Sequence, residues 1–467
     1  MVTDMYQIDL NKPVHVYFIG IGGISMSGIA QILIDRNFTV SGSDSKESAL
    51  TDELVSLGAK VFIGQKASNI ESLTSSINVV TYTSAIHPDN PEFAAAKAAG
   101  LPMLRRSELL GQIMKHYELP ISISGTHGKT TTTSMISKIL LEADTDPTLS
   151  IGGIFKDING NTRIGSSKFF VAEACEYTNS FLNLYEKIGI ILDIDADHLD
   201  FFKDLDDIRH SFKTFAGNIP DDGYLIINGA IDNLNEITSE LKCKVITFGI
   251  GEGFDYYATE ITYDSYANPT YTLVSALDGS KHVVTLSVPG EHNILNSLAA
   301  AAAAILCDVK MDTIVTALKD YQGTDRRFQR KGEFDGITVV DDYAHHPTEI
   351  AATLTAARNF PHKDIWCVFQ PHTYTRTKSL LPDFAKALCL ADHVVLADIY
   401  AARETDNLGI SSRTLQAEIK KLGHECYYYP SFEEIEKFLL QNCTKKDLLI
   451  TMGAGDVYQI GEELLGK

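Results

Sequence analysis

The chain has 467 residues, of which 44% are hydrophobic and 22% are charged, and its formal net charge is −21. A chain of this length exceeds a single hydrophobic core, so several domains are expected, and three is our working number. The composition is typical of a globular protein and excludes a chain that is disordered throughout. The acidic balance argues against a broad surface for nucleic acid or for an anionic membrane, because clustered Lys and Arg bind those partners.

The seven cysteines are scattered along the chain, and no two of them have the CxxC spacing. This pattern argues against a disulfide framework or a thiolate zinc site and favours free thiols in a reducing compartment. The N-terminus lacks a basic segment followed by an apolar run, so no signal peptide is expected. The most apolar stretch, residues 294–309, is short and interrupted by polar residues, which predicts a buried helix. We therefore expect a cytoplasmic protein.

The first part of the chain alternates between strand and helix patterns. Residues 13–20 form a short apolar run that stops at glycines, and residues 24–35 follow with helical periodicity. The alternation continues to about residue 106, which predicts a mostly parallel sheet with helices on both faces. We place a first, Rossmann-like domain at residues 1–106.

A second block opens with an apolar run at residues 120–125, and we assign residues 107–324 to a central domain of the P-loop ATPase type. Between about 255 and 288, short alternating runs predict a small antiparallel section, and a helix is predicted over 289–306. A third, Rossmann-like domain is expected at residues 325–467, where strand and helix patterns alternate again. The predicted fold class is therefore α/β with three domains.

A glycine-rich turn follows the first predicted strand, with Gly20, Gly22 and Gly23 just before the helix. Glycines permit a tight turn and a close approach of the backbone, so amide groups and the helix N-terminus can hold a diphosphate. Ser25 replaces the third glycine of the dinucleotide fingerprint, and Asp44 stands where an acidic residue contacts a ribose. The pattern indicates a nucleotide diphosphate, with a turn that serves only helix packing as the alternative.

The segment GTHGKTT resembles a Walker A loop between a strand and a helix, although Ile123 occupies the place of its first glycine. Lys129 can reach the β- and γ-phosphates, Thr130 can offer its hydroxyl to Mg²⁺, and the backbone amides can cradle the phosphates. The sequence thus predicts an ATP site made of Gly125, Thr126, His127, Gly128, Lys129, Thr130 and Thr131. His127 is expected to lie near the bound substrates and not in the core.

Acidic side chains follow two later strands. Glu173, with Glu176 as the alternative, leaves a strand near the expected position of a magnesium ion. The next strand delivers Asp195, Asp197, His198 and Asp200. Carboxylates and water suit Mg²⁺, and an imidazole can supplement them at a second ion. His198 alone would fit a packed or capping histidine, but beside the P-loop we expect it to contact metal or phosphate.

Two polar pairs stand near the expected junction of the second and third domains. Asn293 and Asn296 lie near the start of a helix and suit hydrogen bonds to an adenine or to a neighbouring loop. Arg326 and Arg327 can supply a guanidinium to the phosphates. Taken singly, these pairs fit a helix cap and a solvated pair better than a ligand site.

Two strand-and-loop segments of the third domain, VVDDYAHHPTEI and CVFQPHTYTRT, carry polar side chains at their ends. Both loops should emerge at the same edge of the sheet, where ligand sites of α/β domains form. An arginine suits a substrate carboxylate, and a histidine suits proton transfer from an amine. The residues expected to converge are Asp342, Tyr343, His345, His346, His372 and Arg376.

Taken together, these segments resemble the ATP-dependent Mur ligases of peptidoglycan synthesis. The motifs are, in order, GIGGISMSGIA, GTHGKTT, EACEY, DADHLD, EHNILNSLAA, DRRFQ, DDYAHHPTE, FQPHTYTRT and GAGD, and they span nearly the whole chain. The chain is most similar to the branch that adds L-alanine to UDP-N-acetylmuramate. The resemblance implies one domain for the UDP-sugar, one for ATP and one for the amino acid, and we expect these domains to close before chemistry.

The resemblance also assigns roles to the residues. The implied catalytic residues are Lys129, His198 and His345, and the implied metal ligands are Thr130, Glu173 and His198. The ATP site would add Asn293, Arg326 and Asp342 to the P-loop residues. The implied contacts of the sugar nucleotide are Gly20, Gly22, Gly23, Ser25, Asp44, Ser84 and His87. The implied contacts of the amino acid are Tyr343, His345, His346, His372 and Arg376.

The implied reaction needs ATP because a carboxylate is a poor acyl donor. ATP would convert the lactyl carboxylate of UDP-N-acetylmuramate into an acyl phosphate, which the amine of L-alanine attacks. The implied cofactors are ATP and Mg²⁺, with two ions and with Mn²⁺ able to substitute. The expected partners are these small molecules, with no nucleic acid and no membrane, and the protein is expected to be a monomer or a homodimer.

Three other functions stay open at this point. A related ligase attaches a murein tripeptide to the same sugar nucleotide, and other relatives would use glycine or serine. An NAD-linked oxidoreductase would explain Gly20 and Asp44 but would leave GTHGKTT without a use. A binding or regulatory protein would not need so many charged groups at strand ends.

Overall fold

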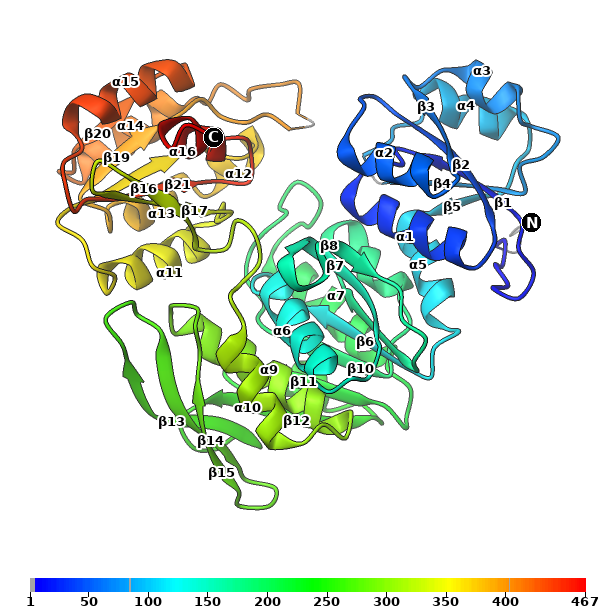
Figure 1. The fold of residues 1–467 in the computed structure, drawn as a ribbon, viewed down its shortest axis with the longest axis horizontal. Helices are drawn as coiled ribbons and strands as arrows, with labels where there is room; N and C mark the ends of the chain where they lie inside the picture. The colour runs from blue at the N-terminus through cyan, green and yellow to red at the C-terminus, as the bar shows by residue number, and fades with distance from the viewer. Residues whose placement is uncertain (1–4, 84, 403) are drawn as a thin grey trace.

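The structure is a computed structural model that describes residues 5–83, 85–402 and 404–467. Three sheets of five, ten and six strands follow one another along the chain, and helices cover them (Figure 1). The predicted α/β class with three domains is confirmed. Ser84, an expected contact of the sugar nucleotide, lies outside the described ranges.

The first sheet is entirely parallel, in the order β3-β2-β1-β4-β5. Its strands are β1 (His15–Ile19), β2 (Thr39–Asp44), β3 (Lys60–Ile63), β4 (Val79–Tyr82) and β5 (Met103–Arg105). The helices are α1 (Ile24–Asp35), α2 (Ala49–Ser56), α3 (Ala67–Glu71), α4 (Pro91–Ala98) and α5 (Arg106–Met114). Strand β1 is buried along its whole length, because helices cover both faces of a parallel sheet. The strand order reverses between β1 and β4, and ligand crevices of such sheets form at that point.

The middle sheet has the order β15-β14-β13-β12-β11-β10-β6-β9-β7-β8. Its strands are β6 (Leu119–Ser124), β7 (Thr148–Phe155), β8 (Gly160–Arg163), β9 (Phe169–Glu173), β10 (Ile188–Ile191), β11 (Tyr224–Asn228), β12 (Lys244–Ile250), β13 (Tyr256–Tyr263), β14 (Pro269–Ser275) and β15 (Lys281–Thr285). Strands β13, β14 and β15 pair antiparallel, as predicted for this part of the chain. The carboxyl ends of the parallel strands β6, β9 and β10 meet at one edge, which carries the P-loop.

The helices of the middle part are α6 (Lys129–Glu142), α7 (Leu205–Gly217), α8 (Asn235–Thr238), α9 (His292–Leu306) and α10 (Met311–Asp320), with short 3₁₀ turns η1 (Lys156–Ile158) and η2 (Tyr177–Asn183). The alanine-rich stretch forms the buried helix α9, as predicted, and it packs against α6. Small side chains let the two helices approach closely. In the described ranges, no helix combines the length and low polarity needed to cross a bilayer.

The third sheet has the order β16-β17-β21-β18-β19-β20, with only the edge strand β16 antiparallel. Its strands are β16 (Gln329–Phe334), β17 (Ile337–Asp342), β18 (Ile365–Phe369), β19 (His393–Leu396), β20 (Cys426–Tyr428) and β21 (Leu448–Met452). The helices are α11 (Pro347–Arg358), α12 (Tyr374–Ser379), α13 (Leu381–Leu388), α14 (Ser412–Lys421), α15 (Phe432–Asn442) and α16 (Tyr458–Leu464). Strands β17 and β18 run parallel on either side of β21, so the loops after them emerge at the same edge, as expected.

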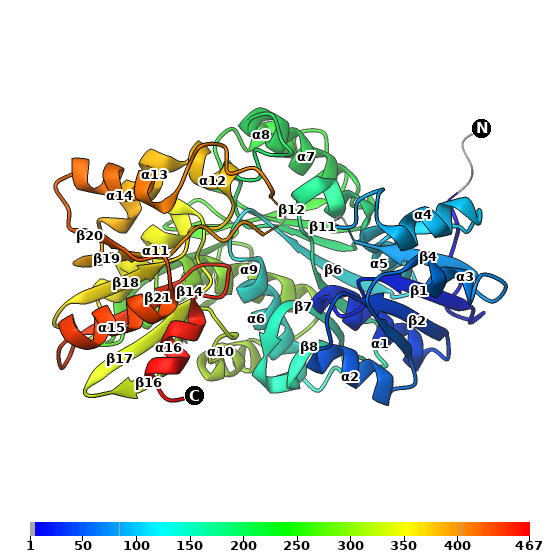
Figure 2. The ribbon, with the colours of Figure 1, turned by 90° about the horizontal axis from the view of Figure 1, so that it is seen from above.

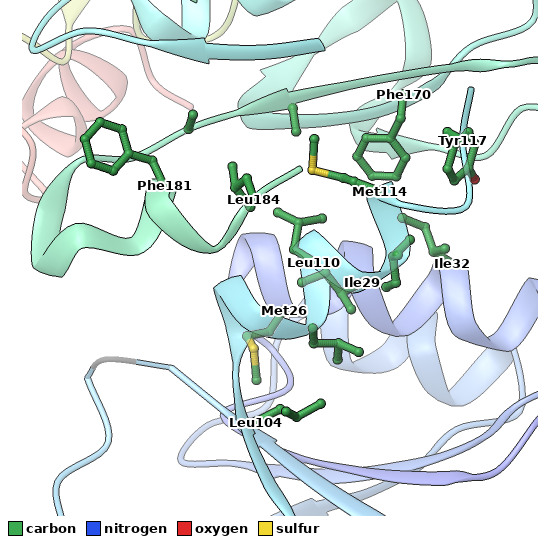
Figure 3. Packing of buried hydrophobic residues seen from close by; sticks show 14 of the residues in the cluster. Met26, Ile29, Ile32, Leu104, Leu110, Met114, Tyr117, Phe170, Phe181 and Leu184 are labelled. Carbon is green, nitrogen blue, oxygen red and sulfur yellow. The ribbon is translucent and has the colours of Figure 1, made fainter. Parts of the chain in front are cut away.

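The first and middle parts share one hydrophobic cluster (Figure 3). Helix α5 contributes Leu110 and Met114, which lie between α1 and residues of the middle part such as Phe170. The backbones approach so closely that a Cβ on Gly28 would lie 2.1 Å from Oγ1 of Thr162. Seen from above, the first and third sheets lie at opposite ends of the molecule, with α6 and α9 between them (Figure 2).

Candidate functional site

The P-loop connects β6 to α6 through two glycines with positive φ, Gly125 at 141° and Gly128 at 80°. A Cβ on Gly128 would lie 2.5 Å from Oδ1 of Asn296, so glycine is required there both by conformation and by space. Helix α6 begins directly after Gly128, and its first amide groups face the loop. The sequence therefore builds an anion-binding turn at the centre of the molecule.

Lys129 extends back across the P-loop. Its Nζ donates to the carbonyls of Gly125 at 2.5 Å and Thr126 at 3.0 Å, and it lies 2.9 Å from Oε2 of the buried Glu176. Burial disfavours the charged amine, but the Glu176 carboxylate outweighs burial and raises the pKa of Lys129. Lys129 is therefore a cation whose position is fixed by its ion pair with Glu176. The sequence offered Glu176 only as the alternative to Glu173 near the magnesium ion.

Glu173 ends strand β9 beside the P-loop. Its Oε1 accepts from the N–H of Gly152 at 2.6 Å, and burial raises the pKa of its carboxyl group, with Thr130 close enough to donate to it. Thr130 is itself buried in the first turn of α6. The Thr130 hydroxyl and the Glu173 carboxylate thus offer oxygen ligands at one place.

His198 follows β10 with φ of 54°, an uncommon backbone conformation for a histidine. Its Nε2 lies 3.6 Å from Oε1 of Glu176 and 3.7 Å from Oδ2 of Asp197. Burial lowers its pKa, which keeps the ring neutral and able to act as a ligand. Among the described residues, Nδ1 of His198 and Oε1 of Glu176 are buried without a hydrogen-bond partner.

His127 lies between the middle and third parts of the molecule. Its N–H donates to Oδ1 of Asp193 at 2.8 Å, its Nε2 lies 3.3 Å from Asp195, and its Nδ1 lies 3.4 Å from Glu349. Burial lowers the pKa of the imidazole, but hydrogen bonds to Asp195 and Glu349 outweigh burial and raise it to about 10. His127 also lines the cavity beside the P-loop, so its ring does not point into the core.

A cavity of about 270 Å³ opens beside the P-loop, between α9 and the start of α11. Its polar lining includes Gly128, Asn293, Asn296, Arg327, Asp342 and Glu349, and its apolar lining includes Leu192, Phe248, Tyr321 and Phe328. Asn293 donates to the carbonyl of Pro289, and Oδ1 of Asn296 accepts from Thr132. Asn296 therefore ties α9 to α6, and Asn293 ties the start of α9 to the segment before it, while both line this cavity.

The two adjacent arginines of the connection to the third part point to different places. Arg326 donates to Asp341 and to the carbonyls of Gly453 and Gly455, so its guanidinium is held inside the third part. Arg327 lines the cavity instead. The resemblance implied that Arg326 contacts ATP, whereas in the structure Arg327 lines the cavity beside the P-loop. The sequence indicated only that one of the two adjacent arginines could reach the phosphates.

Asp342 ends strand β17 at the wall of the same cavity. Its carboxylate accepts from the N–H groups of Phe328 and Ala344 at 2.8 and 2.7 Å. Burial raises its pKa to about 6, even with the Arg327 guanidinium nearby. Asp342 thus offers a carboxyl group fixed by two backbone donors.

A second cavity of about 200 Å³ lies between the loop after β10 and the loops after β17 and β18. Its lining includes Asp197, His198, Tyr343, His345, His372 and Arg376. Nε of Arg376 lies 2.9 Å from Oδ1 of Asp197, a buried ion pair that joins the third part to the middle part. The structure therefore brings His198 together with four of the predicted amino-acid contacts.

The two neighbouring histidines after β17 differ in position. Nδ1 of His345 lies 3.1 Å from the carbonyl of Tyr343 and 3.2 Å from Glu349, and burial lowers its pKa to about 4. His346 caps α11 and places Nε2 3.2 Å from the carbonyl of Ala196. Only His345 lines the second cavity.

Several of the predicted sugar-nucleotide residues lie at or beside the start of α1. Oδ2 of Asp44 accepts from the N–H of Gly22 at 2.9 Å, so this carboxylate braces the glycine turn. Ser25 accepts from Nη1 of Arg106 at 2.9 Å. His87 is exposed on the loop after β4.

Arg106 is a polar residue that the sequence reasoning missed. It begins α5, contacts Ser25 of the first part, and lies close enough to Cys175 and Glu173 for their charges to affect its pKa, which burial lowers. Glu349 was also missed, although it contacts both His127 and His345. The doubled arginine of LRRSELL and the glutamate of HHPTE were the available signals.

Three family models match the chain in succession. The Mur ligase family catalytic domain matches residues 15–118, the Mur ligase middle domain matches residues 123–304, and the Mur ligase glutamate ligase domain matches residues 326–455. The UDP-N-acetylmuramate–L-alanine ligase of Lachnospira eligens is 59% identical over 463 residues, which cover 99% of this chain and the whole of that protein. The ligase of the same name from Agathobacter rectalis is 57% identical over 464 residues, with the same coverage.

Solved structures agree with these matches. The UDP-N-acetylmuramate-alanine ligase of Thermotoga maritima superposes with a TM-score of 0.80 at 28% identity, over 97% of this chain and 98% of that one. A murein peptide ligase of Psychrobacter arcticus superposes with a TM-score of 0.72 at 24% identity, over 97% and 98%, and shares the fold. The matched models cover most of the chain, and the close relatives cover nearly all of it. The chain therefore belongs to the Mur ligase family.

Proposed function

We propose that the protein is an ATP-dependent ligase that joins L-alanine to the lactyl carboxylate of UDP-N-acetylmuramate. The observation that carries the proposal is a pair of cavities where the middle and third parts of the chain meet. His127 and Gly128 line the larger cavity, while His198 and Arg376 line the smaller one. An activated carboxylate placed between them would meet the phosphate donor from one side and the amine from the other. Relatives with 59% and 57% identity carry the name of this activity.

The larger cavity has the features of an ATP site. Its apolar walls suit an adenine ring, and the amides at the start of α6 suit the phosphates. Lys129 would bind the β- and γ-phosphates, with Asn293 and Asp342 at the nucleoside end of the cavity. Arg327 is added as a phosphate contact, and Arg326 is assigned to holding the loop that carries Arg327.

Thr130, Glu173 and His198 would hold magnesium, with Mn²⁺ able to substitute. Two buried atoms without partners among the described residues, Nδ1 of His198 and Oε1 of Glu176, fit this assignment because a cation would satisfy such atoms. Bound magnesium supplies positive charge that offsets the charge developing on the transferred phosphoryl group. The protein's own contribution is the Lys129 ammonium, which Glu176 holds in place.

The smaller cavity suits the amino acid. Arg376 would bind the carboxylate of L-alanine, and Asp197 orients the guanidinium by accepting from Nε and Nη2. Both groups near Nδ1 of His345, the Tyr343 carbonyl and Glu349, are acceptors, so Nδ1 carries the ring proton and Nε2 keeps a lone pair. That lone pair would accept a proton from the amine, with Tyr343, His346 and His372 shaping the pocket.

The first part of the chain is proposed to hold the sugar nucleotide. The turn of Gly20, Gly22 and Gly23 and the start of α1 suit the diphosphate. Ser25, Asp44, Ser84 and His87 are proposed contacts as well. We accordingly assign residues 1–106 to the UDP-sugar, residues 107–324 to ATP and residues 325–467 to the amino acid.

The proposed reaction has two steps, formation of an acyl phosphate and its reaction with the amine. A lactyl carboxylate oxygen attacks the γ-phosphorus, the bond to the β-phosphate oxygen breaks, and ADP leaves with that electron pair. The amine of L-alanine then attacks the carbonyl carbon, loses a proton, and expels inorganic phosphate. The products are the amide, ADP and phosphate, and the carboxylate oxygen that attacked ends in the phosphate.

Product analysis tests this proposal. Protein, ATP, Mg²⁺ and UDP-N-acetylmuramate are incubated with L-alanine, glycine, L-serine or a murein tripeptide, and the sugar nucleotide is analysed by mass spectrometry. We expect one alanyl group per sugar nucleotide, with ADP formed in equal amount, and turnover with the tripeptide at least about a hundredfold lower because the cavity is small. Equal turnover with tripeptide, or ADP formation without any amide, would refute the proposal.

A further inference from the structure

A second group of metal-type ligands lies where the P-loop meets the start of α11. His127, Asp195 and His346 each offer one ligand atom, and these three atoms all lie within 4.8 Å of one another. None of these residues belongs to the proposed magnesium site. His127 and Asp195 come from the middle part of the chain, and His346 comes from the third part.

The outer nitrogens of both imidazoles face acceptors. Nδ1 of His127 lies 3.4 Å from Oε1 of Glu349, and Nε2 of His346 lies 3.2 Å from the carbonyl of Ala196. An ion would displace the proton that Nε2 of His127 donates to Asp195. Each ring then keeps one proton on its outer nitrogen, and its inner nitrogen presents a lone pair toward Asp195. Metal-binding histidines show this same pattern, with the second ring nitrogen donating to a carboxylate or a carbonyl.

The distances are close to those of a tetrahedral site. Nε2 of His127 lies 3.3 Å and Nδ1 of His346 lies 3.8 Å from Oδ2 of Asp195. Ligand atoms bonded to zinc at roughly 2.0 to 2.1 Å stand roughly 3.4 Å apart in a tetrahedron. The first of these two edges already fits, and the second must shorten by a few tenths of an ångström. The third edge, between the ligand atoms of the two imidazoles, lies within 4.8 Å.

The surroundings allow an ion to enter and to keep a water ligand. The side chain of Asp195 is 38% exposed, whereas those of His127 and His346 are 13% and 5% exposed. An ion would displace the N–H of Thr348 from Nδ1 of His346, where it donates over a long 3.3 Å. The Thr348 hydroxyl, 2.7 Å from Oδ2 of Asp195, can stay because that oxygen has a second lone pair.

We propose that His127, Asp195 and His346 bind a divalent transition ion of the zinc type, separate from the magnesium ions of the reaction. Two imidazole nitrogens and one carboxylate suit Zn²⁺, Co²⁺ or Ni²⁺, whereas Mg²⁺ prefers an octahedral set made mostly of oxygen ligands. Because the ligands come from two domains, the ion binds only the arrangement in which these domains touch, and it stabilises that arrangement. Because His127 belongs to the P-loop, the ion also holds the phosphate-binding loop to α11.

Cobalt is the probe, because tetrahedral Co²⁺ absorbs visible light strongly and octahedral Co²⁺ does not. The full-length, tag-free protein is titrated with Co²⁺ in excess Mg²⁺, and we expect one equivalent to bind with a tetrahedral spectrum. Asp195→Asn and His346→Asn should weaken Co²⁺ binding at least about a hundredfold, by loss of a direct ligand. Asparagine at position 346 keeps an acceptor for the helix cap. His210→Gln, which removes an exposed histidine of α7, should leave binding unchanged.

X-ray absorption of the zinc-loaded parent protein tests the site without any substitution. We expect two imidazole nitrogens and light oxygen ligands. Sulfur ligands, loss of the ion to excess Mg²⁺, or full Co²⁺ binding by folded Asp195→Asn protein would overturn the proposal. None of these results would bear on the ligase activity, which is measured with Mg²⁺ alone.

Discussion

The two junctions between the three parts of the molecule differ in chemistry: one is apolar and the other is charged. Between the first and middle parts, α1 and α5 bury Met26, Ile29, Leu110 and Met114 in one apolar cluster (Figure 3). Between the middle and third parts, charged groups meet instead, as in the pair of Asp197 and Arg376. Apolar burial is stabilising wherever the surfaces fit, whereas ion pairs add little net stability but fix positions.

Both cavities lie at the charged junction. Its ion pairs can separate when the middle and third parts move apart. We infer that the first part is a fixed platform for the sugar nucleotide and that the third part opens and closes over the P-loop. Burial of an apolar cluster must be undone to separate the first junction. The second junction can exchange its ion pairs for water and substrate charges. The following changes test this difference between the apolar and the charged junction, and the site that the charged junction encloses.

The largest expected effect comes from Lys129→Ala. This change removes the cation that stabilises the transferred phosphoryl group, so alanine-dependent ADP release should fall on the order of a thousandfold or more. The measurement is steady-state ADP formation with all substrates saturating. Lys138→Ala is the matched control, because Lys138 lies on the same helix and pairs with Asp157 away from the loop. Near-normal turnover of the Lys129 variant would remove the P-loop from the mechanism.

Gly111→Ala disturbs the packing of α5, the helix that connects the first and middle parts, against η2 of the middle part. A Cβ at this position would lie 1.9 Å from the carbonyl oxygen of Asn183, so α5 must move away from η2. We expect a loss of roughly 1 to 3 kcal/mol in the free energy of unfolding, measured as a lower urea midpoint. Gly217→Ala is the control, since its Cβ would meet nothing within 4 Å and alanine favours the helix. Equal midpoints for both variants would contradict tight packing at this junction.

At the charged junction, Arg376→Lys should act on binding more than on stability. Lysine keeps the charge but cannot hold Asp197 and a substrate carboxylate with the same planar fork. The KM for L-alanine should rise about tenfold to a hundredfold, while the KM for ATP and the urea midpoint change little. The matched control is Arg358→Lys, at the exposed pair with Asp392 inside the third part. An unchanged KM for L-alanine would move the amino-acid site elsewhere.

The last prediction concerns the pH dependence of stability in the middle part, which both junctions share. Glu186 is buried, and burial raises its pKa to about 8 from an ordinary value of 4.5, although Ser122 donates to it. The folded state then keeps a proton that the unfolded chain releases. The contribution of Glu186 to the free energy of unfolding is therefore full below about pH 4.5 and is lost as the pH rises toward 8. Relative to Glu186→Gln, the parent should lose at most about 1.4 kcal/mol of stability per pH unit in that window. Urea midpoints at several pH values measure this, and a difference that does not change with pH would contradict it.

The sequence predicted what is encoded locally. The P-loop could be found because Gly125, Gly128, Lys129 and Thr130 are neighbours that must share one turn. The convergence of the loops after β17 and β18 followed from the common direction of parallel strands. The helix α9 and the antiparallel section also followed from local hydrophobic patterns.

Contacts between distant segments could not be predicted in the same way. Whether Arg326 or Arg327 turns to the P-loop depends on the positive φ of Arg326, 63°, which no residue pattern at that site announces. The contact of Glu349 with His127 depends on how the third part docks on the middle part. The close approach at Gly111 likewise depends on packing against η2 and is invisible in an isolated glycine.

The central claim, that ATP activates the lactyl carboxylate at this junction, is tested most directly by isotope transfer. UDP-N-acetylmuramate labelled with ¹⁸O in both lactyl carboxylate oxygens is turned over with ATP and L-alanine, and the released phosphate is analysed by mass spectrometry. We predict one ¹⁸O atom in each phosphate and the other in the amide carbonyl. Unlabelled phosphate, with amide formed, would contradict the acyl phosphate that we infer from the arrangement of the two cavities.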